Sequence, residues 1–167
     1  GKDDSIYTSN AQIDGMSILK IDTSFPLIKS KNNVEETLTP KISFRVNPGN
    51  NMDDYSGSSK NISASSAFDL NRLGLSNDFE AGRSLTFGLD YKFDLLENTQ
   101  TENVKDKYLE LKLATVVRDQ FENDIPISST INKKNSDLFG SINNQLFDNI
   151  NLTYNFSLDN DMKTINS

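Results

Sequence analysis

Two stretches of this chain alternate apolar and polar side chains without interruption, and this alternation most constrains the fold. Successive side chains of a β-strand point to opposite sides, so each stretch is predicted to be a strand with one apolar and one polar face. The first stretch covers residues 84–93 and the second covers 150–158. Their apolar members are Leu85, Phe87, Leu89, Tyr91 and Phe93 in the first, and Ile150, Leu152, Tyr154, Phe156 and Leu158 in the second.

Four further segments show the same pattern less regularly. The segment 107–117 contains good helix formers, but its leucines recur at every second position, which favours a strand. A short strand within 62–70 is also expected, and residues 28–38 are expected to be a polar connection. The predicted main strands are therefore about 16–27, 40–46, 84–93, 107–117, 136–145 and 150–158.

The polar faces of these strands carry charges that a dry core would not tolerate. Lys41 and Arg45 share one face of the segment 40–46. Two cations on one face of a central strand are costly in an apolar interior but cost little beside a water-filled lumen. The candidate lumen-lining residues are Lys41, Arg45, Asp90, Lys92, Glu110 and Lys112.

The lengths of the connections provide an independent test of this interpretation. Longer connections, 47–83 and 118–135, alternate with shorter ones, as in outer-membrane β-barrels with short periplasmic turns and long extracellular loops. Ten residues at roughly 3.3 Å each, tilted by about 45°, cover roughly 23 Å, close to the apolar band of such barrels at ~25 Å. About six strands cannot close, because the smallest such barrels need about 8. Residues 1–167 are therefore predicted to be an all-β, antiparallel up-and-down meander, an open segment of a transmembrane β-barrel, with 47–83 and 118–135 outside the cell.

Composition excludes several function classes. The chain has 35% hydrophobic residues, a net charge of −7, and neither Cys nor His. It has no basic patch for nucleic acid, no Ser-His-Asp triad, and no Cys or His to bind zinc. Asp53 and Asp54 lack the spacing of an EF-hand loop and are expected to be solvated. We therefore expect no catalytic, cofactor or metal site. The chain starts with neither an initiator Met nor a signal-peptide core, so we expect an internal piece of a longer protein.

The loop before the first regular strand, together with that strand, carries the most specific motif. The segment FDLNRLGLSNDFEAGRSLTFGLDYKF contains an Asn-Arg pair, acidic residues, a Gly-x-Arg-like end and a Gly-containing strand. It resembles the pattern of the LPS-assembly protein LptD, the outer-membrane translocon for lipopolysaccharide. Phe25-Pro26-Leu27 before it, and Ser136–Gly140 and Leu152–Phe156 after it, are similar to neighbouring strands of that family. The motif residues of the loop are Asn71, Arg72, Asp78, Glu80, Gly82 and Arg83.

The resemblance implies a location in the Gram-negative outer membrane and a role in assembling lipopolysaccharide at its outer leaflet. The parent would be a large barrel plugged by an LptE-like lipoprotein, with a jellyroll domain receiving lipopolysaccharide from the periplasmic Lpt bridge. Lipid would leave between the first and last strands. This chain would be a middle section of the wall, without the jellyroll or those strands. Neither enzymatic activity nor a cofactor is implied, and no family disulfide can involve a segment without Cys.

Two alternatives remain open at the level of sequence. One is the wall of another outer-membrane barrel, either a porin or a plugged receptor. The other is a secreted all-β binding module, which would fold alone in water. Within the motif loop, we expect Arg83 and either Glu80 or Asp78 to form a network that orders the loop rather than a substrate site.

Overall fold

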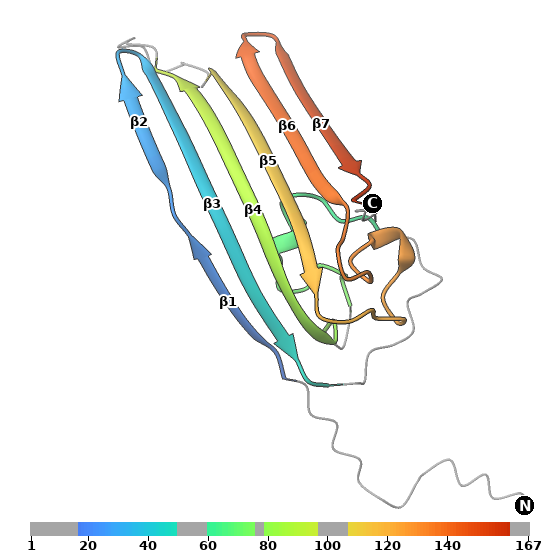
Figure 1. Ribbon diagram of the computed structural model, residues 1–167. Helices are drawn as coiled ribbons and strands as arrows, with labels where there is room; N and C mark the ends of the chain where they lie inside the picture. Colours follow the sequence, from blue (N-terminus) through green and yellow to red (C-terminus); the bar gives the residue numbers. More distant parts are fainter. Residues whose placement is uncertain (1–16, 50–59, 76–78, 97–106, 161–167) are drawn as a thin grey trace, which may run out of the picture.

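The computed structural model describes residues 17–49, 60–75, 79–96 and 107–160, which form a single antiparallel sheet (Figure 1). Within these ranges the sheet has seven strands, in the order β1-β3-β4-β5-β6-β7, and β2 also pairs with β3. The sheet is open, so the predicted all-β, up-and-down meander is confirmed. The strands are β1 Leu19–Ser24, β2 Leu27–Lys31, β3 Val34–Asn47, β4 Gly82–Leu95, β5 Lys107–Arg118, β6 Leu138–Phe147 and β7 Ile150–Leu158.

The first predicted strand, 16–27, is interrupted and ends later than expected. Ser24 lies opposite Lys41 and Leu27 lies opposite Leu38, so the register with β3 is continuous across the break. The break falls at Phe25 and Pro26, because proline has no N–H to donate to the ladder. The edge of the sheet is therefore one interrupted ribbon, β1 followed by β2.

The polar connection predicted at 28–38 is wrong, because β2 and β3 leave only Asn32 and Asn33 between them. Asn32 has a φ of 54°, a left-handed conformation that asparagine tolerates better than most residues. The charges that suggest a loop instead pair across the hairpin, with Lys29 Nζ 3.7 Å from Glu36 Oε2. The predicted strand 40–46 thus extends to Val34–Asn47.

The register gives the sheet two different faces. Phe44, Leu85 and Val117 lie side by side across three strands, and Ile42, Phe87 and Thr115 form the next row. We call this side the apolar face, since much of its hydrophobic surface is exposed. Its exposed members include Leu19, Ile21, Ile42, Phe44, Leu85, Phe87, Leu89, Leu152 and Tyr154.

The opposite side, which we call the loop-covered face, is packed against the long connections. Residues 60–75 contain the short 3₁₀ helix η1, Ser66–Phe68, which lies against β5. The strand expected within 62–70 is therefore wrong. Ser63 Oγ accepts from the backbone N–H of Ser66 at 3.0 Å, and Ser66 Oγ accepts from that of Ser63 at 2.9 Å. Such local bonds compete with strand pairing and favour a turn.

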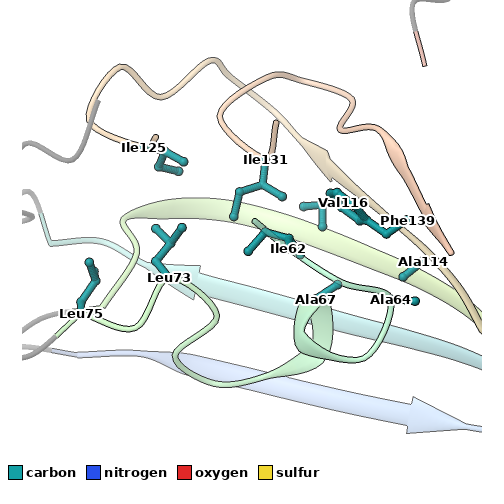
Figure 2. Packing of buried hydrophobic residues seen from close by; sticks show 10 residues of the cluster. All are labelled: Ile62, Ala64, Ala67, Leu73, Leu75, Ala114, Val116, Ile125, Ile131 and Phe139. Carbon is teal, nitrogen blue, oxygen red and sulfur yellow. The ribbon is translucent and has the colours of Figure 1, made fainter. Parts of the chain in front are cut away.

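A small apolar core joins both long connections to the sheet (Figure 2). Ala114, Val116 and Phe139 come from the sheet, and Ile125 and Ile131 from the connection between β5 and β6, which also contains η2, Ile127–Ser129. The first connection contributes Ile62, Ala64, Ala67, Leu73 and Leu75. The loops thus form a second layer over one face of the sheet.

The connections follow the predicted alternation. The links after β3 and β5 are long, and they leave from the end of the sheet opposite the two tight turns (Figure 1). The turn between β6 and β7 contains only Asp148 and Asn149. β6 starts at Leu138, two residues later than predicted. The Oγ of Ser136 accepts from the backbone N–H of Val116 on β5 at 2.9 Å, and the N–H of Asp137 donates to Thr130 Oγ1 in the loop at 3.1 Å. Among the described residues, no helix is long and apolar enough to cross a membrane.

Candidate functional site

Four charged side chains meet beneath the loops on the loop-covered face. They are Glu80 from the first connection, Arg72 from the same connection, Arg45 from β3 and Arg118 from β5; we call them the Glu80 cluster. The side chains of Glu80, Arg72 and Arg118 are each 1% exposed and that of Arg45 is 4% exposed. The cluster therefore lies out of contact with solvent.

Arg72 makes the most complete set of contacts in the Glu80 cluster. Its Nε donates to Glu80 Oε2 at 2.6 Å and its Nη2 donates to Glu80 Oε1 at 2.5 Å, which is a bidentate pair. The same guanidinium donates to Ser84 Oγ at 2.9 Å and to Thr86 Oγ1 at 3.1 Å on β4. A fork of fixed donors suits this arrangement, because these bonds and one to the carbonyl of Ala67 use five N–H donors, whereas lysine has only three.

Arg45 and Arg118 bring the neighbouring strands into the cluster. Arg45 Nη1 donates to Glu80 Oε2 at 3.4 Å, and its Nη2 donates to the carbonyls of Asp69, at 2.6 Å, and Leu70. Arg118 is ion-paired with Glu80, and its Nε donates to the carbonyl of Ile131 at 2.5 Å. The carboxylate of Glu80 therefore links β3, β5 and both long connections.

The electrostatics of the Glu80 cluster suit a structural role. Burial lowers the pKa of Arg72 to about 10, so its guanidinium remains protonated at neutral pH. Both carboxylate oxygens of Glu80 are occupied by guanidinium donors, so neither is free to take a proton from a substrate. The arrangement can hold the loop against the sheet.

Other residues of the sequence motif support the same loop. The amide of Asn71 bonds both ways to Leu75, accepting from its N–H at 2.9 Å and donating to its carbonyl at 2.7 Å. Gly82 has a φ of +86°, and a side chain there would collide with the carboxylate of Glu122. Asp78 lies outside the described residues.

Arg83 does not pair with Glu80, one of the two carboxylates that the sequence predicts as its partner. Its parity on β4 places it with Leu85 on the apolar face, whereas Glu80 lies under the loops. Its side chain is 66% exposed and its Nη2 lies 2.5 Å from Asp119 Oδ2. The predicted pairing of Arg83 with Glu80 is therefore wrong, and Arg72, Arg45 and Arg118 take that place.

The remaining candidate lumen residues form a polar surface toward the tight-turn end of the loop-covered face. Lys41 Nζ is 2.7 Å from Asp90 Oδ2, and Lys112 Nζ is 3.2 Å from Glu110 Oε1. Lys92 Nζ is 2.9 Å from Asp94 Oδ1. These side chains are only partly buried, unlike Arg45, which the sequence also predicts to be solvated. The expectation for Arg45 fails because Asp69, Leu70 and Glu80 of the first long connection contact its guanidinium and bury it.

A contact that sequence reasoning missed lies between this polar surface and the loops. The ring of Phe68 lies over Gly88, where a Cβ would come within 2.5 Å of it, and Lys41 Nζ sits 4.8 Å from the ring centroid. One feature of the sequence points to this contact: Gly88 is a glycine on the polar face of a strand that otherwise alternates regularly. Arg118 was also missed, because it follows the last strand residue of the predicted segment 107–117.

Within the described ranges, no group of three or more acidic side chains is arranged to hold a metal ion. Asp53 and Asp54 fall outside those ranges. The structure thus presents one enclosed ionic cluster, one open polar surface and one apolar face.

A family model described as LptD, LPS transport system D, matches residues 5–167, which is nearly the whole chain. No curated protein and no solved structure matches the chain significantly. The family model covers both the strands and the loop motif on which the sequence resemblance depends.

Proposed function

The chain belongs to the LptD family of outer-membrane lipopolysaccharide-transport proteins, and we propose that it forms a section of barrel wall along which lipopolysaccharide is assembled into the outer leaflet. In this proposal the apolar face contacts lipid and the loop-covered face lines the lumen. The proposed mechanism is physical. Paired strands satisfy backbone polar groups in lipid, and a polar interior admits the saccharide.

The observation that carries this proposal is the distribution of charge on the apolar face. In the cross-strand rows that lie between those of Leu85 and Phe93, the strands β3, β4 and β5 have no charged side chain on the apolar face. Charged pairs flank the band, with Arg83 and Asp119 at the loop end and Lys29 and Glu36 at the turn end. An uncharged band between charged rims is what a membrane-spanning wall requires. A porin or receptor wall would share this band, but the family match favours lipopolysaccharide transport. A secreted module would have to expose the band to water.

The partners in this proposal follow from the family and from the polar surface. Lipopolysaccharide would pass along the loop-covered face, and an LptE-like lipoprotein would occupy the lumen of the complete barrel. The periplasmic Lpt bridge would contact parts of the protein outside this chain. We propose no catalytic step, since the contacts of the Glu80 cluster are structural.

A crosslinking experiment tests the proposed faces. In the full-length parent protein, p-benzoylphenylalanine replaces Ser141 on the loop-covered face or Ile142 on the apolar face. Crosslinks from position 141 to lipopolysaccharide should require continuing lipopolysaccharide synthesis, whereas those from position 142 should be to bulk membrane lipid. Synthesis-dependent crosslinks confined to position 142 would refute the assignment. Normal surface lipopolysaccharide after depletion of the parent protein would refute the function itself.

Labelling tests the proposed orientation of the loops. Ile127 is 64% exposed in the second long connection, and Asn149 lies in the tight turn between β6 and β7. With cysteine at either position, a membrane-impermeant maleimide should label intact cells at position 127 only. Labelling at position 149 alone would place the loops in the periplasm.

A further inference from the structure

Among the motif residues that the structure describes, Arg83 has a position that neither the barrel wall nor the Glu80 cluster explains. It stands at the loop end of the apolar face, one row beyond the pair Phe44 and Leu85. A guanidinium that is two-thirds exposed makes no contribution to the buried ionic cluster. Its position instead places a cation at the boundary between the apolar band and the loops.

A hollow on the apolar face adjoins this cation. It has a volume of about 400 Å³, and its apolar lining comes from Phe44, Leu85 and Val117. Arg83 and Asp119 also line it. The hollow therefore combines an apolar surface on three adjacent strands with a guanidinium at its edge.

The ion pair at this edge can be exchanged at little cost. Arg83 is paired with Asp119 at 2.5 Å, but their side chains are 66% and 39% exposed. Exposed pairs of this kind contribute little net stability, because both ions are well solvated when apart. An anion with more oxygens than a carboxylate can therefore compete for the guanidinium.

We propose that this hollow binds the phosphorylated end of a lipid of the outer leaflet, namely the lipid A portion of lipopolysaccharide. The phosphate accepts hydrogen bonds from the guanidinium of Arg83, for which a planar fork of donors is well matched. The acyl chains lie along Phe44, Leu85 and Val117 on the apolar face. This site is on the outside of the wall, separate from the polar surface of the loop-covered face. It rests on the proposed function for its orientation, which places the loop end at the outer leaflet.

The test uses the full-length parent protein in detergent micelles, with p-benzoylphenylalanine in place of Phe44 so that only this hollow is read. The probe is purified lipid A bearing both phosphates, and the measured quantity is the lipid concentration giving half-maximal crosslinking. Arg83→Gln should raise that concentration by about tenfold, as expected for losing a charge-assisted bond to phosphate. Asp119→Asn should lower it, because the competing carboxylate is removed. Lys29→Gln, which removes a cation at the opposite end of the same face, should leave it unchanged.

A second probe tests the site without changing Arg83 or Asp119. Dephosphorylated lipid A should crosslink to the parent protein with p-benzoylphenylalanine at position 44 about tenfold more weakly than the phosphorylated form. Equal crosslinking of the two lipids, or a change of less than twofold for Arg83→Gln, would overturn the site. Surface lipopolysaccharide measured after depletion of the parent protein separates this failure from failure of the proposed function. If the site fails while transport depends on the parent protein, only the site is withdrawn.

Discussion

Replacing Glu80 by Gln removes the one carboxylate that three buried guanidiniums share. The variant keeps the size of the side chain, so the change is one of charge and hydrogen bonding. Arg72 loses its bidentate partner at 2.5 and 2.6 Å, while Arg45 and Arg118 lose their ionic contact. Removing one partner of a buried ion pair typically costs about 3–5 kcal/mol, because the remaining charges stay desolvated. We expect a loss of free energy of unfolding in that range for Glu80→Gln.

The matched control is the exposed pair. Asp119→Asn also neutralises a carboxylate that faces an arginine, but both side chains are largely solvated, so about 0–1 kcal/mol is expected. The free energy of unfolding is measured by urea unfolding of the full-length protein in lipid vesicles. Gel mobility is a second readout, because the unfolded protein migrates more slowly. If Glu80→Gln costs no more than Asp119→Asn, the Glu80 cluster does not stabilise the fold, and the reasoning fails.

Three further predictions follow from packing and exposure. Gly88→Ala places a Cβ 2.5 Å from the ring of Phe68, so the ring must move, and proteolysis within residues 60–75 should accelerate; unchanged proteolysis would argue against this contact. Ile131→Ala empties a fully buried site and should cost about 2–5 kcal/mol in unfolding, whereas Ile127→Ala, at an exposed position nearby, should cost within about 0.5 kcal/mol. Arg83→Glu should leave barrel assembly unchanged, because the side chain is solvated; an assembly defect measured by heat-dependent gel mobility would return Arg83 to a structural role.

Features that depend on local interactions could be predicted from the sequence, whereas features that depend on pairing between segments could not. The two-residue period of 84–93 and 150–158 matches β4 and β7 closely, because side-chain direction in a strand depends only on position along it. The hairpin at Asn32 and Asn33 was missed because its charges look like those of a loop. They are accommodated by cross-strand pairing, which no single segment reveals.

The candidate site was predicted only in part. Glu80 and Arg72 could be selected from the motif, but their partners Arg45 and Arg118 lie 35 and 38 residues from Glu80 along the chain. Arg83 is closer to Glu80 in sequence than any of the three arginines that pair with it. Strand geometry explains the error, because adjacent residues of a strand point to opposite faces of the sheet. Arg83 points to the apolar face, while Ser84 lies next to Arg72 beneath the loops.

The sequence by itself determined the class of fold, the faces of the regular strands and the family, since alternation and motif order are properties of the linear chain. Only the tertiary structure decided that the long connections fold back over the sheet. This folding back buries Val116 and Phe139 on a face that otherwise carries polar residues. It also buries Arg45, which the sequence predicts to be solvated. The physical reason is that an apolar core and a shared carboxylate form only when β3, β5 and both loops come together. The stabilisation from these contacts therefore exists only in the assembled structure and not in any isolated segment.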